Sequence, residues 1–404
     1  MPCPKPKREN IDTKARWRSA IGLLGTVGLI VAAVASTEVT ASATATATAT
    51  KGPWSYYRSF KDWEVACDNV KRCIAVGALD NDTNLVVWLT REAGPDGAMS
   101  LRMAAAKPAD AAQMRIDGRP FDATPAKWKT LPKQPDSPYP SRFATDDAAV
   151  VSAWVEAARN ATTLSFDDPA RADTPKTSLA GLSAALLAID AAQGRVSTVT
   201  AWVRKGTASA ASVPAALPLP VAPRAAASAA ALPAAEARRL IAATSTQFRA
   251  DIKKCASDDD DSDPDAQAQR RSDNSAAALS DKEALVTLAC DESGAYNHTS
   301  LWYRVQRAAP YRAVPVDFGT NASAGIGSSD SPAPAKNELS DAAFDASSGQ
   351  LESLTRVRSL GDCGDVTRWI FDGSAFVLKE ERTEGSCVGL DNGEWPWLYR
   401  TKPQ

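Results

Sequence analysis

Apolar and polar residues alternate in the stretch after residue 54, as expected for half-buried β-strands. Trp63, Val65 and Cys67 alternate with Glu64 and Ala66. Three further stretches have the same β-rich character, namely Cys73–Leu79, Leu85–Leu89 and Ser100–Met103. The Asp117-Gly118 dipeptide then predicts a turn. We therefore expect a mostly antiparallel sheet in the first part of the chain.

Two later segments carry apolar residues at helical spacing. Asp146–Arg159 places its apolar residues on one helical face, and Thr145 or Asp146 can cap its start. Ser178–Gln193 has a second such stripe, and Gly194 should end that helix. Thr198–Val203 is predicted to return to a strand. Residues 54–212 therefore predict an N-terminal α+β lobe.

Residues 213–233 read VPAALPLPVAPRAAASAAALP. Proline disfavours both helix and sheet, and alanine buries little surface. This stretch predicts a Pro/Ala-rich linker between two lobes.

The remainder, residues 234–404, predicts a C-terminal β-rich lobe, a β-meander packed on one helix. The helix is expected over Ala234–Lys254. Expected strands, hairpins and turns are Ala284–Cys290, Ser300–Val305, Ala343–Leu354 around Ser348-Gly349, Val366–Glu381 around Asp372-Gly373, and Asn392-Gly393. The fold class is therefore α+β, mainly β, with two lobes of antiparallel sheet joined by the Pro/Ala-rich linker.

An acidic insertion interrupts this second lobe over residues 258–275. Its low hydrophobicity predicts a disordered, solvated loop. Calcium binding at Asp258–Asp261 is the alternative, but an EF-hand needs a glycine at loop position six and a terminal glutamate, which are missing here.

The first 43 residues have the pattern of a secretory signal peptide. Three basic residues precede the uncharged apolar run Ala20–Ala35, and Ala41-Ser42-Ala43 offers a cleavage site. The run is shorter than the roughly 20 residues that span a bilayer, although an uncleaved N-terminal anchor stays an alternative. Residues 44–53 follow as an Ala/Thr tether. We expect a periplasmic or secreted bacterial protein with no stable membrane insertion after cleavage.

Charge excludes one class of partner. Loss of residues 1–43 would move the formal net charge from −2 to −5. Nucleic-acid binding relies on clustered basic residues that displace counterions, and no such cluster is present. We expect no nucleic-acid partner.

Six cysteines remain after Cys3 is removed with the signal peptide, and an even number in an exported chain predicts disulfides. Many pairings are possible. We favour sequential pairing because each bridge then lies within one local unit, as Cys67 with Cys73, Cys255 with Cys290, and Cys363 with Cys387. Zinc is the rival, but no pair has CxxC spacing and His298 is the only histidine. No metal or cofactor is expected.

Several motifs resemble one bacterial exported family, domain-of-unknown-function family 1176. They are Phe60-Lys61-Asp62-Trp63-Glu64-Val65-Ala66-Cys67-Asp68-Asn69 with Cys73, Leu89–Pro95, Ser178–Leu182 with Gln193-Gly194-Arg195, Gly294–Asn297, and Leu360–Gly364 with Trp369. The first lobe is also faintly similar to the invasion-associated locus B family. The resemblance implies export and architecture and lends no activity. The chain departs from the family at the acidic insertion and at Arg356-Val357-Arg358-Ser359.

Candidate chemistry is sparse. Histidine-assisted nucleophilic catalysis would depend on His298, which stands in a polar stretch more typical of a surface residue. A mechanism that uses only carboxylates needs two acids in one cleft, and Asp362 and Asp365 beside Cys363 are the candidates. Their alternative role is turn hydrogen bonding.

Trp395 and Trp397 suggest a binding surface if they are exposed as an aromatic platform, and core packing is the alternative. The leading hypothesis is an exported cell-envelope protein of unknown activity, a non-catalytic binding or inhibitor module whose partner is an envelope protein or glycan. The alternatives are a carboxylate-dependent hydrolase acting on cell-wall material and an envelope structural factor.

Overall fold

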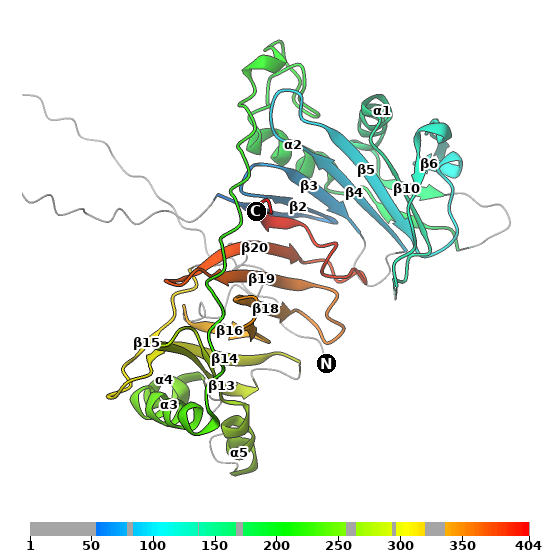
Figure 1. Ribbon diagram of the computed structural model, residues 1–404. Coiled ribbons are helices and arrows are strands. Elements are labelled where there is room, and N and C mark those ends of the chain that lie inside the picture. Colours follow the sequence, from blue (N-terminus) through cyan, green and yellow to red (C-terminus); the bar gives the residue numbers. More distant parts are fainter. Residues whose placement is uncertain are drawn as a thin grey trace, which may run out of the picture. The chain divides into compact units, whose positions relative to one another are not determined.

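The strands predicted near the N-terminus form one antiparallel sheet of seven strands (Figure 1). The computed structural model describes residues 54–78, 84–135, 137–166, 173–255, 264–292, 296–319 and 336–403. The strand order is β1 (Tyr56–Phe60), β2 (Trp63–Cys67), β3 (Cys73–Gly77), β4 (Leu85–Arg91), β5 (Met99–Ala105), β9 (Ser141–Thr145) and β8 (Lys129–Thr130). A small antiparallel sheet follows, of β11 (Lys176–Ser178), β10 (Thr163–Phe166), β6 (Met114–Ile116) and β7 (Arg119–Pro120).

Both faces of the seven-stranded sheet are covered. Alternate side chains of a strand point to opposite faces, so Val65 and Val87 pack in one core while Val86 and Trp88 pack in another. The first core includes residues of α1 (Ala148–Ala158) and α2 (Leu182–Ala192). The second core adds residues from the C-terminal part of the chain, namely Val366, Val388, Leu390, Trp395 and Leu398. This double coverage explains why β3 and β4 are apolar at nearly every position.

The C-terminal half contributes two more antiparallel sheets, stacked below the first in the view of Figure 1. One contains β12 (Ser275–Ala278), β13 (Glu283–Glu292), β14 (His298–Gln306), β15 (Ala313–Pro315) and β16 (Glu338–Ser340). The other contains β17 (Ala343–Asp345), β18 (Gln350–Arg356), β19 (Gly364–Phe371), β20 (Phe376–Glu384) and β21 (Trp397–Tyr399). The mainly β, α+β fold class is confirmed, as are the hairpins at Ser348-Gly349 and Asp372-Gly373.

Helix predictions were confirmed in part. The predicted helix over Asp146–Arg159 is α1, capped by the side chain of Asp147. The predicted helix over Ala234–Lys254 is divided into α3 (Ala234–Gln247) and α4 (Arg249–Cys255) at Phe248, whose ring stacks on Tyr303. The prediction of a single helix in the second lobe is therefore wrong, since α5 (Pro264–Asp273) is also present. None of the helices in the described residues has the length and apolar character that a membrane crossing requires.

Three local predictions were wrong. Ser178 ends strand β11 and the helix begins at Leu182, because the extended backbone before it is held by Trp63 Nε1, which donates to the Ser178 carbonyl at 3.1 Å. Thr198–Val203 forms turns and bends with one isolated bridge at Thr198, because the amides of Trp202 and Val203 donate to buried Asp190 and not to a neighbouring strand. In the acidic insertion, residues 264–273 are helical, while residues 258–263 lie outside the described part.

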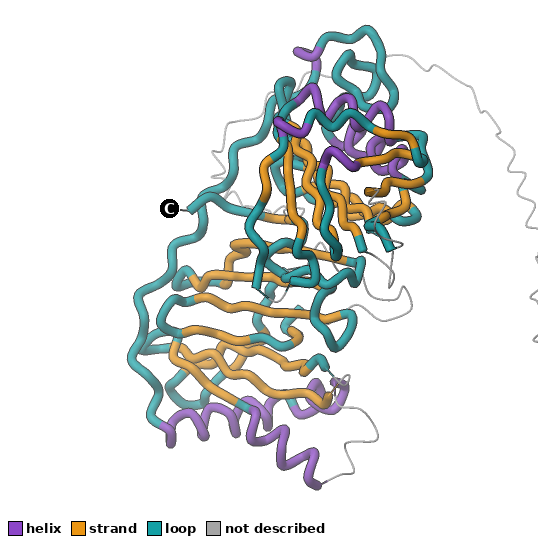
Figure 2. Tube along the Cα trace, turned by 90° about the vertical axis from the view of Figure 1, so that its right-hand side faces the viewer, coloured by secondary structure: helices purple, strands orange, loops and turns teal. Residues whose placement is uncertain are grey.

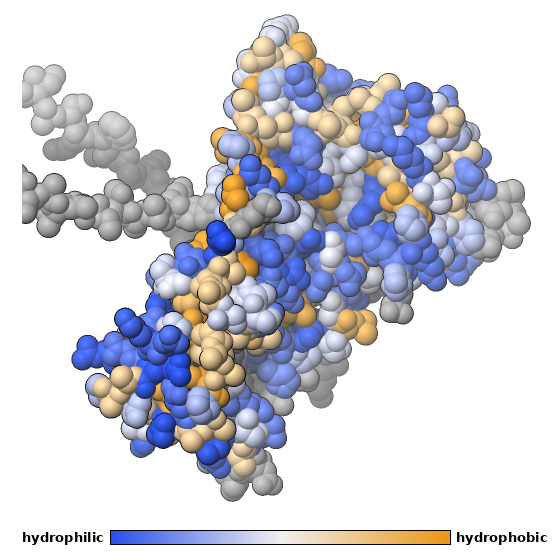
Figure 3. All heavy atoms as spheres, in the orientation of Figure 1, coloured by the Kyte–Doolittle hydropathy of each residue, from blue (hydrophilic) through white to orange (hydrophobic). Residues whose placement is uncertain are grey.

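Residues 213–233, named here the strap, run in an extended conformation beside the C-terminal sheets (Figures 1 and 2). The amide of Ala222 donates to the Lys402 carbonyl, and the amide of Ala226 donates to the Phe371 carbonyl, both at 2.9 Å. Figure 3 shows a band of weakly hydrophobic residues along its course. Prolines prevent regular pairing along the strap, yet these isolated hydrogen bonds attach it to the sheets.

Cleavage within the strap is expected to leave the two fragments associated. Residues 51–404 form one compact unit, and the second core joins strands from both sides of the strap. The three disulfides each lie on one side of it. A protease that cuts near exposed Leu217 or Val221 should therefore give fragments that co-elute in native size exclusion and separate on a denaturing, non-reducing gel. Separate elution without denaturant would show two independent lobes.

Candidate functional site

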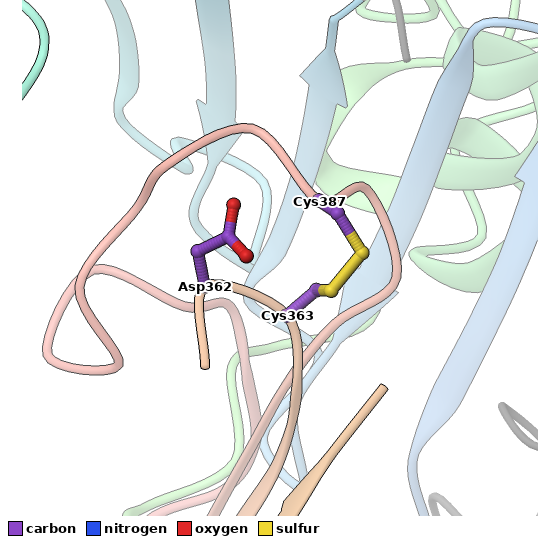
Figure 4. Close-up of side chains that lie close together, drawn as sticks. All are labelled: Asp362, Cys363 and Cys387. Carbon is purple, nitrogen blue, oxygen red and sulfur yellow. A yellow bond between two sulfur atoms is a disulfide. The ribbon is translucent and has the colours of Figure 1, made fainter. Parts of the chain in front are cut away.

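The disulfide Cys363–Cys387 joins two loops at one end of the last sheet (Figure 4). One loop connects β18 to β19, and the other follows β20. The other two bridges are Cys67–Cys73 and Cys255–Cys290, so the predicted sequential pairing is confirmed. The Cys363–Cys387 bridge fixes the distance between the loops and limits the conformations that each can adopt.

Asp362 is held by a dense set of donors. Arg358 donates Nε and Nη2 to its two oxygens at 2.8 and 2.6 Å, and the amide of Gly389 donates to Oδ2 at 2.6 Å. Burial acts to raise the pKa of Asp362, but these hydrogen bonds and the charge of Arg358 outweigh it and leave the pKa below the ordinary value. Asp362 is therefore an ionised structural acceptor at neutral pH.

Asp362 also lies close to both sulfurs, with its ligand atoms and theirs within 4.8 Å of one another (Figure 4). A metal would need the cysteines as thiolates. Because the two sulfurs are bonded to each other, this group is not a metal centre in the oxidised chain.

A crevice of about 260 Å³ lies beside the disulfide. Its lining combines apolar side chains with polar surface, and Arg358 and Asp362 are its charged members. The lining residues are Ala106, Pro138, Tyr139, Arg358, Leu360, Asp362, Cys387, Val388 and Gly389. Tyr139 is buried and donates its hydroxyl to the Val388 carbonyl, so its ring forms a fixed wall. An apolar side chain or small apolar group suits such a site.

The loop that contributes Leu360 to the crevice lining carries two exposed apolar residues. Leu360 is 76% exposed and Val357 is 44% exposed. The loop is closed by a hydrogen bond from the Val357 amide to the Cys363 carbonyl, and Tyr296 Oη donates to the Val357 carbonyl at 2.8 Å. Leu360 is thus presented to solvent by a loop that is fixed at both ends.

A carboxyl pair, with one member fully buried and the other half-buried, lies near the same disulfide. Glu384 ends β20 and is fully buried, and Glu64 of β2 accepts hydrogen bonds from Tyr57 Oη at 2.6 Å and from the Gly385 amide at 3.2 Å. Burial, the charge of Glu64 and a hydrogen bond with Glu64 raise the pKa of Glu384 well above its ordinary value of 4.5. Two carboxyl groups can hydrogen-bond to each other only when one carries a proton, and Glu384 is the member whose ionisation the fold opposes.

Comparison with known proteins assigns the chain to a family. The family described as "Protein of unknown function (DUF1176)" matches residues 57–402. The chain belongs to this family. It is also similar to "Uncharacterized protein YpfG" of Escherichia coli (strain K12), with 30% identity over 355 residues that cover 85% of this chain and 93% of that protein. No solved structure matches.

One of the DUF1176 motifs recognised in the sequence lies at the crevice. Leu360–Gly364 supplies the exposed rim residue, the ion-paired aspartate and one sulfur of the bridge. The motif Gln193-Gly194-Arg195 is structural in this chain, since the buried Arg195 donates to the carbonyl groups of Glu92, Gly94 and Pro95. The resemblance to the invasion-associated locus B family stays a prediction.

The other residues singled out in the sequence are dispersed in this DUF1176 chain. Trp395 is 1% exposed and belongs to the second core, so it cannot form a surface platform with Trp397. Trp397 is half-buried beneath Arg382, whose guanidinium lies 3.5 Å from the ring centroid. Asp365 lies within β19, half-buried, outside the crevice lining. His298 is exposed at the start of β14.

Sequence reasoning missed the residues that complete the site. Tyr139 and Val388 are 249 positions apart and meet only in the fold, and the same holds for Glu64 and Gly385, which are 321 positions apart. The run Arg356–Ser359 was noted only as a departure from the family. An apolar residue at position 360, three positions before Cys363, was the one local signal for an exposed apolar side chain at the crevice.

Proposed function

We propose that this chain is an exported, non-catalytic binding protein of the bacterial periplasm or cell exterior, and that the crevice beside Cys363–Cys387 is its binding site. The signal-peptide pattern of residues 14–43 supports export. Three disulfides agree with an oxidising compartment. The partner is an envelope protein that inserts an apolar side chain into the crevice.

The observation that carries this proposal is the exposure of Leu360 on a fixed loop. Burial of an apolar side chain of this size is worth about 1.5–3 kcal/mol, which an isolated chain forgoes by leaving Leu360 76% exposed. A loop that is already rigid loses little conformational entropy on binding. The Arg358–Asp362 ion pair and the disulfide supply that rigidity.

The hydrolase alternative has less support at the crevice. Carboxylate-only hydrolysis needs two acids facing one cleft about 5–10 Å apart. In the described residues, Asp362 is the single carboxylate among the lining residues, and Arg358 and Gly389 already occupy its oxygens. Glu64 and Glu384 do form a pair, but Glu384 is fully buried.

Replacement of Leu360 by aspartate is expected to abolish partner capture. The oxidised mature chain, which should begin near Thr44 by mass analysis of protein from cells, is immobilised and exposed to envelope extract. Leu360→Asp should reduce retention of the partner by about tenfold or more, equivalent to about 1.4 kcal/mol. Leu217→Asp is the matched control, because Leu217 is also exposed, at 55%, but lies on the strap.

Equal retention of a partner by the wild-type chain, Leu360→Asp and Leu217→Asp would contradict the proposed site. Retention of no partner protein by the wild-type chain would contradict it as well. A retained glycan in place of a protein would contradict the proposed class of partner. Retention of residues 1–43 by protein recovered from cells would contradict cleaved export.

A further inference from the structure

The segment that follows β20 connects the buried carboxyl pair to the crevice. Glu384 is the last residue of β20, Cys387 is bridged to Cys363, and Val388 and Gly389 line the crevice. Residues 384–389 therefore connect Glu384 to the crevice wall through a few residues of backbone.

The backbone at Gly385 packs closely against Tyr57 and Glu64. A side chain at Gly385 would meet the hydroxyl of Tyr57 and would lie 2.6 Å from Glu64 Oε1. Oε1 of Glu384 accepts from the Ser386 amide at 3.0 Å, whereas its buried Oε2 receives no donor in the described part of the chain while both carboxyl groups are ionised. A proton on Glu384 would give this group a donor directed at Glu64.

The ionisable groups that act on Glu384 and Tyr57 are acidic, and the nearby cation Arg358 is paired with Asp362 and donates to the Cys387 carbonyl at 2.8 Å. Tyr57 is on β1 and Glu64 is on β2. Asp365 is on β19, and Asp362 lies in the loop just before it. Burial and the charges of Glu64, Glu384 and Asp365 raise the pKa of Tyr57, so it stays a protonated donor. The pKa of Tyr139 is also raised, by burial and by the charges of nearby Asp362, Glu384 and Glu394. A second negative charge on the pair would thus meet repulsion and burial together.

We propose that Glu64 and Glu384 form a pH-operated latch, in which one shared proton holds residues 384–389 closed and loss of that proton releases them and loosens the crevice wall. The effect on partner capture rests on the function proposed above, whereas the latch itself does not. Because the folded state raises the pKa of Glu384, the stabilisation by its protonated form is complete below the unfolded value of 4.5 and is lost as pH rises through the folded value.

Hydrogen exchange of the whole chain tests the latch without a partner. The exchange rate of amides 384–389, corrected for the intrinsic effect of pH, should rise by about tenfold or more on going from acidic to alkaline buffer. Glu384→Gln should keep the segment protected throughout, because its neutral amide can donate to Glu64 at every pH. Glu64→Gln should also flatten the profile, and it serves as a second variant if the first does not fold. Glu156→Gln, at a surface glutamate with 53% side-chain exposure, should follow the wild type.

A flat wild-type profile, or variants that open with pH as the wild type does, would overturn the latch. An opening caused by a chelator at low pH would also overturn it, since a cation would then bridge the pair. If the latch responds to pH while Leu360→Asp leaves capture unchanged, the latch stands and the proposed binding site fails. If capture depends on Leu360 but the exchange rate does not change with pH, the proposed binding site stands and the latch fails. If the latch and the binding site are both correct, partner capture should weaken at alkaline pH and should recover in Glu384→Gln.

Discussion

Replacement of Glu394 by alanine is expected to destabilise the protein by about 3–5 kcal/mol, a large share of the roughly 5–15 kcal/mol that stabilises a typical domain. Glu394 receives Nη1 of Arg142 at 3.1 Å as well as Nη2, and Nη1 of Arg102 lies 3.1 Å away. The Arg142 and Glu394 side chains are 3% and 5% exposed. The alanine variant would leave the buried Arg142 guanidinium and the half-buried Arg102 guanidinium without their shared acceptor.

Arg102 shows that this environment already opposes positive charge. Its guanidinium lies 3.8 Å from the ring centroid of Trp88, and burial lowers its pKa to about 10 despite the favourable charge of Glu394. Equilibrium denaturation of Glu394→Ala at neutral pH should show the loss. Glu156→Ala is the control, because Glu156 pairs with Arg159 and Lys205 at the surface and should change stability by less than about 0.5 kcal/mol. A midpoint for Glu394→Ala equal to that of the control would mean that the three charges are solvated in solution.

Trp395→Ala is expected to cost about 3–5 kcal/mol, the range for truncating a large buried aromatic residue. Trp395 is 1% exposed, lies in the core shared by the seven-stranded sheet and the C-terminal segment, and donates its indole N–H to the Leu390 carbonyl at 3.3 Å. The substitution removes this packing and leaves a cavity beneath the segment that carries the crevice wall.

Thermal unfolding distinguishes this core role from the platform that the sequence suggested. Trp54→Ala is the comparison, since Trp54 is 42% exposed and packs near Lys71 at the surface. It should lower stability by only about 0.5 kcal/mol. An unchanged melting temperature in Trp395→Ala would place the indole at the surface and restore the platform hypothesis.

The crevice, the latch and these two core positions all involve the docking of residues 385–398 on the seven-stranded sheet. Glu64 and Trp88 present the sheet side of that contact, and Gly385 and Trp395 present the other. The exposed Leu360 stands beside it on the loop bridged to Cys387. We infer that variants here couple stability to binding, so each capture experiment requires a matched melting curve.

Local sequence determined the parts of this fold that depend on neighbouring residues. Alternation over Trp63–Cys67 specified β2, the periodicity of Val150, Trp154 and Ala158 specified α1, and glycine-containing dipeptides specified the hairpins. The disulfide pairing was predictable because each pair lies within about 35 positions in the chain, so each bridge closes a loop inside one local unit.

Tertiary structure alone decided which side chains meet across the chain. Nothing near Glu384 indicates that it is buried against Glu64, and the alternation around Trp395 does not tell whether its indole faces solvent or the sheet. The wrong strand at Thr198–Val203 has a nearer cause, because the amides of Trp202 and Val203 donate to Asp190, 12 and 13 positions earlier, in place of strand pairing. The physical reason is that periodicity reports which face of an element is apolar. What covers that face depends on the free energy of docking segments hundreds of residues apart, which no local pattern encodes.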